Sequence, residues 1–193
     1  MPGNAADQAA RAALRKRQGK GARYDAASAP HDDLLLARRG TAFFARKLME
    51  LSDADLYRPS AVESVTHAHV VAEISFSARR QALLLEALCN GRPDKIPADL
   101  VQQFSDLDLA ATLPPHAIRH LFRHSQAHLN VCWRDLSDAQ WNEPLTTPDG
   151  RDTIPSSQPR RRAVHIWRSA LDLGNGASLR DLPAELRVEC SSS

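Results

Sequence analysis

Two turns of nearly the same sequence constrain the fold of this 193-residue chain more than any other feature. Residues 50–60 read ELSDADLYRPS and residues 135–145 read DLSDAQWNEPL, so LSDA and a proline recur at the same offset. Each turn follows one predicted helix and precedes another, as expected for two stacked helical hairpins in a four-helix bundle. Chance similarity of two helix-ending turns is the alternative, because short matches support a repeat only weakly.

Four segments around these turns have the apolar periodicity and the end signals of helices. They are predicted at about 32–51, 62–90, 115–136 and 158–173. Pro115 suits a first helical position, and Gly91 and Gly174 suit the positions just after a helix ends. Aromatic residues make up only 5% of the chain, which favours helices over strands. The predicted fold class is therefore all-α.

The segments between and beyond the helices complete this prediction. A long, partly helical connection is expected at 92–113, and Asp149–Gly150 predicts a tight turn in a short hairpin before the fourth helix. Residues 1–30 are predicted to be a flexible basic N-terminal tail, and 176–193 an irregular C-terminal tail with one helical turn near 183–187. The bundle itself is expected to span 31–175.

Composition and charge exclude several classes of function. A net charge of +2 gives no general electrostatic attraction to nucleic acid. No segment approaches the ~20 apolar residues of a membrane span. Three scattered cysteines and a polar N-terminus predict reduced thiols in a cytoplasmic protein. The protein is expected to be a monomer or a homodimer. The basic run Arg160–Arg162 is interpreted as a solvated helix end, with a phosphate or carboxylate site as the alternative.

Glu73 is the most informative single residue, because it lies on the apolar stripe of the second predicted helix. A buried, unpaired carboxylate costs several kcal/mol or shifts its pKa, so Glu73 needs a partner or a wet cavity. His165 on the fourth helix, with Ser169 one turn later, is the candidate to face it. A Glu–His pair in a cavity is a plausible acid/base unit. A purely structural pair is the alternative.

Other histidines offer further hypotheses. His69 precedes Glu73 by four residues, and with His165 these two would give the two-imidazole, one-carboxylate set of a zinc-like site. His120, His124 and His128 follow one another at steps of four along the third helix. A solvated face is the usual explanation of such a ladder.

Substrate-binding residues are the next expectation. If the ladder faced the bundle interior, His124 and His128 would border the Glu73–His165 cavity. Trp167 is a candidate to line that pocket, and Arg168 to hold an acidic substrate through paired N–H donors.

Three stretches carry a family resemblance. They are LSDADLYRPS followed by SVTHAHVVAEISFSARRQALLLEALCNG, then LSDAQWNEPLTTPDGR, and last RRAVHIWRSALDLGNGASLRDLPAEL. In this order and spacing, over about 32–188, they resemble the mycothiol-dependent maleylpyruvate isomerase family of the DinB-like superfamily. The resemblance implies a DinB-like four-helix bundle, a divalent metal between the second and fourth helices, and a low-molecular-weight thiol cofactor.

At the three positions where the resemblance implies metal ligands, this chain has different residues. The family's helix-two histidine corresponds to Glu73, its helix-four glutamate to His165, and its helix-four histidine to Ser169. Serine is a poor zinc ligand, so the implied cofactor is either none or a divalent metal at a rebuilt site.

The resulting prediction is a small-molecule enzyme of isomerase, cyclase, lyase or transferase type that acts on a small acidic substrate. Glu73 and His165 would move protons, and Ser169 would position substrate or water. The alternatives are a metal-dependent thiol S-transferase or hydrolase, and a pseudoenzyme that only binds.

Overall fold

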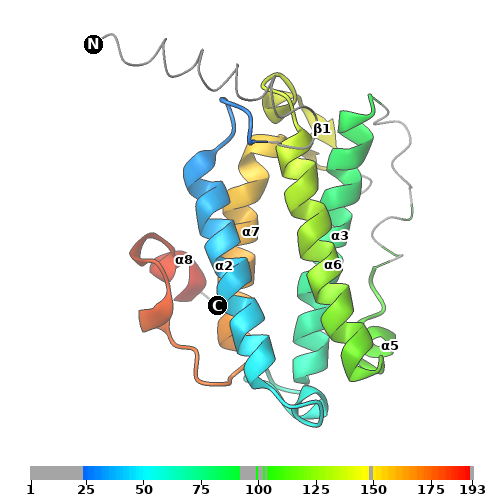
Figure 1. The fold of residues 1–193 in the computed structure, drawn as a ribbon, viewed down its shortest axis with the longest axis vertical. Coiled ribbons are helices and arrows are strands. Elements are labelled where there is room, and N and C mark those ends of the chain that lie inside the picture. The colour runs from blue at the N-terminus through cyan, green and yellow to red at the C-terminus, as the bar shows by residue number, and fades with distance from the viewer. Residues whose placement is uncertain (1–23, 92–98, 100–101, 103, 148–149, 192–193) are drawn as a thin grey trace.

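The computed structural model describes residues 24–91, 99, 102, 104–147 and 150–191 (Figure 1). Four long helices form the predicted all-α bundle: α2 (His31–Glu50), α3 (His67–Cys89), α6 (Pro115–Asp135) and α7 (Gln158–Asp172). Helix α2 packs mainly on α7, and α3 mainly on α6 (Figure 1). No described helix is long and apolar enough to cross a lipid bilayer.

The two similar turns have the same local structure. In the first, the backbone N–H and hydroxyl of Ser52 both donate to the Asp55 carboxylate; in the second, those groups of Ser137 donate to Oε1 of Gln140. Each turn continues into a short 3-10 helix, η2 (Asp55–Tyr57) or η4 (Gln140–Asn142). One side chain from each, Leu56 or Trp141, is fully buried. The repeat in sequence is thus a repeat in structure.

Helix α3 begins at His67, about five residues later than its apolar pattern predicted. Ser64 has a left-handed backbone (φ 61°), and the Ser60 N–H donates to the Val65 carbonyl, so the chain turns before the helix starts. Thr66 then serves as the N-cap residue. Hydrophobic periodicity cannot detect this turn, because its few residues continue the apolar stripe.

The connections agree with the sequence prediction. Within the described residues, the segment between α3 and α6 includes the short helix α5 (Leu107–Ala111). Strands β1 (Leu145–Thr146) and β2 (Asp152–Thr153) pair antiparallel and form the predicted short hairpin before α7. Gly150 has the left-handed backbone (φ 77°) expected of this turn; Asp149 lies outside the described residues.

The described part of the N-terminal segment differs from the predicted flexible tail. Arg38 on α2 makes two hydrogen bonds, of 2.6 and 2.7 Å, to the Asp25 carboxylate. Ser28 is bonded through its backbone N–H to Asp138, and Ala29 is buried. Residues 24–30 are therefore attached to the bundle, through contacts that a pattern of local composition does not reveal.

The C-terminal segment also differs from its prediction. An irregular tail was expected apart from one helical turn near 183–187, and η7 (Ala184–Leu186) lies in that turn. The segment also forms η6 (Leu179–Asp181) and helix α8 (Arg187–Ser191), which were not predicted. Leu182, Leu186 and Cys190 are buried against the bundle. These apolar side chains recur every four residues, so the segment covers one side of α7.

Replacing Asp25 by asparagine should lower the free energy of unfolding by about 1 kcal/mol at pH 7, since the pair is partly exposed. The Arg38 hydrogen bonds hold the pKa of Asp25 below its ordinary value. The stabilisation is therefore present above about pH 4, the unfolded pKa, and is lost as pH falls through the folded pKa. Urea unfolding at pH 7 and near pH 2 would measure this. Asp53→Asn, at an exposed pair, is the control. If the unaltered protein and Asp25→Asn differed in stability as much near pH 2 as at pH 7, the prediction would be contradicted.

Candidate functional site

Glu73 on α3 and His165 on α7 meet, as the sequence predicted. The two atoms Nε2 of His165 and Oε2 of Glu73 lie 2.6 Å apart. The other ring nitrogen, Nδ1, lies 3.3 Å from the hydroxyl of Ser77, one turn beyond Glu73 on α3. The side chains of Glu73 and His165 are 37% and 32% exposed, so a small molecule from solvent can reach the pair.

The surroundings of Glu73 favour its ionised form. Burial by itself raises the pKa of this carboxyl. The hydrogen bond and positive charge of His165 act in the opposite direction, together with the charges of Arg80 and Arg162. The balance leaves the pKa of Glu73 below its ordinary value. Glu73 is therefore a carboxylate at neutral pH that orients the His165 ring.

Arg162 supplies a cation from inside the bundle. Its side chain is fully buried, and its Nη2 donates to the Ile74 carbonyl (3.0 Å) and to Oε1 of Gln126 (2.8 Å). Burial lowers the pKa of Arg162 to about 9, although the nearby Glu73 carboxylate opposes this. The guanidinium thus stays charged at neutral pH. It links α7 to both α3 and α6, within electrostatic reach of Glu73.

Ser169, Arg168 and Asp172 continue the site along α7. Ser169 is one turn after His165 and is buried. Burial raises the pKa of Asp172, while Arg168 and His165 lower it and Glu73 raises it further, so Asp172 interacts electrostatically with the pair. Arg168, predicted to bind substrate, lies within electrostatic reach of Asp172.

His69 does not join Glu73 and His165. Its Nδ1 lies 2.7 Å from the hydroxyl of Thr66 and accepts the Thr66 N–H at 3.3 Å, so the ring closes the first turn of α3. Its Nε2 lies 3.1 Å from Asp108 of the helix α5. Within the described residues, no group of three histidine, cysteine or acidic side chains is arranged to hold a metal ion. The hypothesis of a triad of His69, Glu73 and His165 is therefore wrong in its geometry.

The histidine ladder lies elsewhere. The rings of His120 and His124 stack at 5.9 Å, and both side chains are exposed. His128 lies 3.5 Å from both Glu86 and Arg79 on α3. The solvated-face interpretation fits this arrangement. The structure does not bring His124 or His128 to the Glu73–His165 pair.

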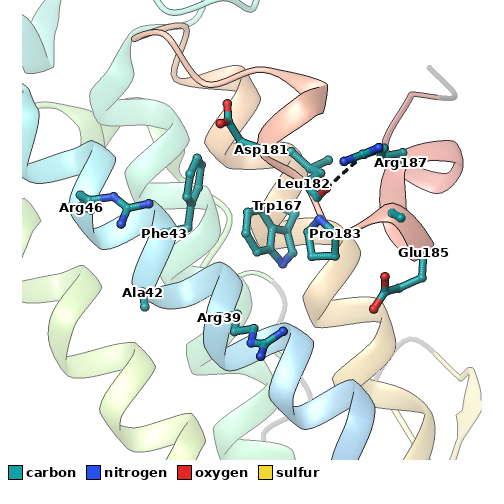
Figure 2. A pocket seen from close by; sticks show the side chains of 11 residues that line it. Arg39, Ala42, Phe43, Arg46, Trp167, Asp181, Leu182, Pro183, Glu185 and Arg187 are labelled. Carbon is teal, nitrogen blue, oxygen red and sulfur yellow. Dashed lines mark hydrogen bonds between the residues drawn. The ribbon is translucent and has the colours of Figure 1, made fainter.

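Trp167 borders a different pocket (Figure 2). Residues two apart in a helix point about 200° from each other, so Trp167 and His165 lie on opposite sides of α7. The indole N–H donates to the Leu36 carbonyl (3.1 Å), and its ring packs on Phe43. Gly40 makes room for this ring, since a Cβ there would lie 2.8 Å from Nε1 of Trp167. The pocket, of about 670 Å³, separates α2 from the C-terminal segment.

Three residues near the pair were not singled out for it from the sequence: Ser77, Arg162 and Asp172. Helical spacing offered a signal for two of them. Ser77 follows Glu73 by four residues and Asp172 follows His165 by seven, so each shares a face with the predicted residue. Arg162 had a weaker signal, because three arginines in a row give no indication of which one is buried.

Fold and site together define a helical-bundle protein with a polar pair between its second and fourth long helices. The family model described as the mycothiol maleylpyruvate isomerase N-terminal domain matches residues 37–174. The chain belongs to this family, as its sequence motifs predicted.

Solved structures agree with this assignment. Two structures of the mycothiol-dependent maleylpyruvate isomerase, one of them a histidine-to-alanine variant, are similar with a TM-score of 0.72 and 29% sequence identity. In each case the similarity covers 83% of this chain and 67% of the other. A search of curated protein sequences found no match.

The resemblance implied a divalent metal at the positions of Glu73, His165 and Ser169, but these residues do not suit one. Both ring nitrogens of His165 are engaged, by Glu73 and Ser77. The third position offers a serine hydroxyl, which is a poor ligand for zinc-like ions. The residues at these positions therefore do not fit a zinc-like ion.

Replacing Ser169 by histidine should create a zinc site. The new imidazole would lie one turn from His165 and, with Glu73, would complete two imidazoles and one carboxylate. We expect about one equivalent of zinc per chain after loading and dialysis, measured by elemental analysis, against well below one for the unaltered protein. Ser169→Ala is the control and should gain none. Equal zinc in all three proteins would contradict the prediction.

Proposed function

We propose that this protein is a small-molecule enzyme in which Glu73 and His165 act as an acid/base pair on a small anionic substrate. The observation that supports it most directly is the 2.6 Å contact between the two side chains at a point that solvent reaches. An ionised carboxylate bonded to one ring nitrogen leaves the other nitrogen to exchange a proton. Membership of a family whose solved relatives are isomerases adds to this argument.

The proton-exchanging atom in this proposal is Nδ1 of His165. Glu73 accepts the hydrogen bond from Nε2–H, which fixes the tautomer and stabilises the imidazolium when a proton arrives. The Ser77 hydroxyl, 3.3 Å from Nδ1, donates to the neutral ring and can pass a proton between the ring and a bound molecule. Ser169 is proposed to position substrate or water from one turn further along α7.

The proposed substrate is anionic because cations surround the pair. Arg80 and Arg162 both act on Glu73, and Arg168 on Asp172. Arg162 is enclosed by protein, so its charge acts at a distance, whereas Arg80 and Arg168 are only partly buried. These two are the candidates to attract a carboxylate group.

The most specific version of the proposal is cis–trans isomerisation of an unsaturated dicarboxylate with a thiol as cosubstrate. When bound, a thiol supplies a nucleophile that adds reversibly to a polarised carbon–carbon double bond. The residues present fit such a partner, since a neutral imidazole is a suitable base for a thiol proton. His165 would hold that proton at Nδ1. The alternative of a non-catalytic binding protein predicts ligand binding without turnover.

The test is an assay of the full chain with maleylpyruvate, the compound in the relatives' name, in the presence of mycothiol, of glutathione or of neither. Formation of the trans isomer, followed by chromatography, is expected only with a thiol. Turnover that needs His165 would support the acid/base role. Turnover unchanged in Glu73→Gln and His165→Ala would refute it. Saturable binding without turnover would favour the non-catalytic alternative.

A further inference from the structure

Four of the eight histidines of this chain lie on helix α6, at steps of four residues. Residues at this spacing share one face of a helix, and their side chains are neighbours. His116, His120 and His124 are exposed, whereas Phe122, which points about 200° away from His120, is buried. The histidines therefore form a row of imidazoles on the solvent-exposed face of α6.

His120 and His124 are the two members of this row whose rings lie together and are available. Their ring centroids are 5.9 Å apart, and the ring planes differ by 24°. Neither ring nitrogen of either histidine makes a hydrogen bond or ion pair with another described residue. His128 differs, because its Nδ1 lies 3.5 Å from Arg79 and its Nε2 lies 3.5 Å from Glu86.

The fourth histidine, His116, is less suited to bind a cation. It lies in the first turn of α6, directly after Pro115. The N-terminal end of a helix carries a partial positive charge, which disfavours a bound cation within that turn. The pair formed by His120 and His124 is therefore the best placed to hold a positively charged ligand.

Two imidazoles on successive turns of a helix form a chelating pair for a divalent transition metal. The same spacing places the two histidines of the H-E-x-x-H motif on one metal ion. Imidazole binds copper, nickel and zinc, and Cu²⁺ is the tightest of the three at a given set of ligands. Zinc usually takes at least three protein ligands, and no such group of three exists among the described residues. Copper and nickel accept tetragonal sites with nitrogen and oxygen ligands, so water can complete the coordination.

We propose that His120 and His124 form a surface site for one Cu²⁺ or Ni²⁺ ion, with water at the remaining coordination positions. The two exposed side chains can rotate about their χ torsions until one nitrogen of each ring lies about 2 Å from the ion. An ion at this pair leaves His116 and His128 without an adjacent unoccupied imidazole, so one ion per chain is expected. The inference does not depend on the acid/base proposal, because no residue is shared between the two sites.

Metal titration of the untagged full chain tests the site. Ni²⁺ and Zn²⁺ are the calorimetric probes, because neither ion oxidises the free cysteines. About one Ni²⁺ should bind per chain, whereas Zn²⁺ should bind more weakly and be removed by dialysis. Electron paramagnetic resonance with less than one equivalent of Cu²⁺ should show coupling to two imidazole nitrogens. Absence of Ni²⁺ binding, or a Cu²⁺ spectrum without nitrogen coupling, would overturn the proposal.

Single substitutions locate the ion. His120→Ala and His124→Ala should each weaken Ni²⁺ binding by about tenfold or more, since even loss of a group that only supports a metal ligand costs that much. His116→Ala is the matched control on the same face and should bind like the unaltered protein. His165→Ala should also bind normally, which separates this site from the acid/base pair. Unchanged affinity in folded His120→Ala, or a loss in His116→Ala but not in His124→Ala, would refute the assignment to this pair.

Discussion

His165→Ala should lower kcat/KM for the proposed isomerisation by about 10²–10⁴-fold, the usual contribution of a positioned acid or base. The reason is the position of the ring, which has Nε2 beside the Glu73 carboxylate and Nδ1 beside the Ser77 hydroxyl. Steady-state kinetics with maleylpyruvate and the active thiol would measure the effect. Circular dichroism and urea unfolding should show a folded protein, because the side chain is one-third exposed.

Companion variants separate the roles within the site. Glu73→Gln keeps the shape of the side chain but removes the charge that stabilises the imidazolium, so a loss of kcat is expected with a smaller change in KM. Ser77→Ala should reduce kcat less than His165→Ala does. His124→Ala, on the exposed ladder, is the matched control and should leave kinetics unchanged. Activity within a factor of about two of the unaltered protein in His165→Ala would reject the acid/base role.

Arg162→Met should lower the free energy of unfolding by about 1–3 kcal/mol, the cost of leaving a buried acceptor without its hydrogen-bond donor. The methionine can fill much of the space, but it leaves Oε1 of Gln126 without its guanidinium donor. It also removes a cation that holds the pKa of Glu73 down. Urea unfolding at neutral pH would measure the change.

The neighbouring arginines provide matched controls in the same helix. Arg161→Met and Arg160→Met remove the same charge from exposed or partly exposed positions and should each cost less than about 1 kcal/mol. The double variant Glu73→Gln/Arg162→Met should lose less than the sum of its single variants, since the favourable interaction between the two charges is counted in both single losses. If Arg162→Met lowered the free energy of unfolding no more than Arg161→Met does, Arg162 would not stabilise the core.

The arginine run shows why one part of the site could not be predicted. Consecutive helix positions differ by about 100°, so three adjacent arginines enter three environments. Arg160 pairs with Asp33 and Glu189, Arg161 is exposed, and Arg162 is fully buried. The sequence interpretation as a solvated helix end applies only to the first two, because the orientation of α7 toward the core is set by its neighbours.

Local signals in the sequence determined the helices, their stop positions, the two matching turns and the family. Hydrophobic spacing also placed Glu73 on an inward stripe and so predicted a partner for it, which His165 is. These features follow from the sequence because each depends on residues a few positions apart. The position of His69 shows the limit of such spacing. It shares a face with Glu73, but Thr66 and Asp108 fix its ring at the helix start.

Only the tertiary structure decided which polar groups meet. Contacts between segments far apart in the chain joined Asp25 to Arg38 and brought the charge of Arg162 within electrostatic reach of Glu73. The energy of such contacts depends on burial and on distance to charges from other helices, and neither quantity is present in a local pattern. The sequence alone therefore predicted the bundle and one acid/base pair, while packing of the four helices determined the charges around that pair.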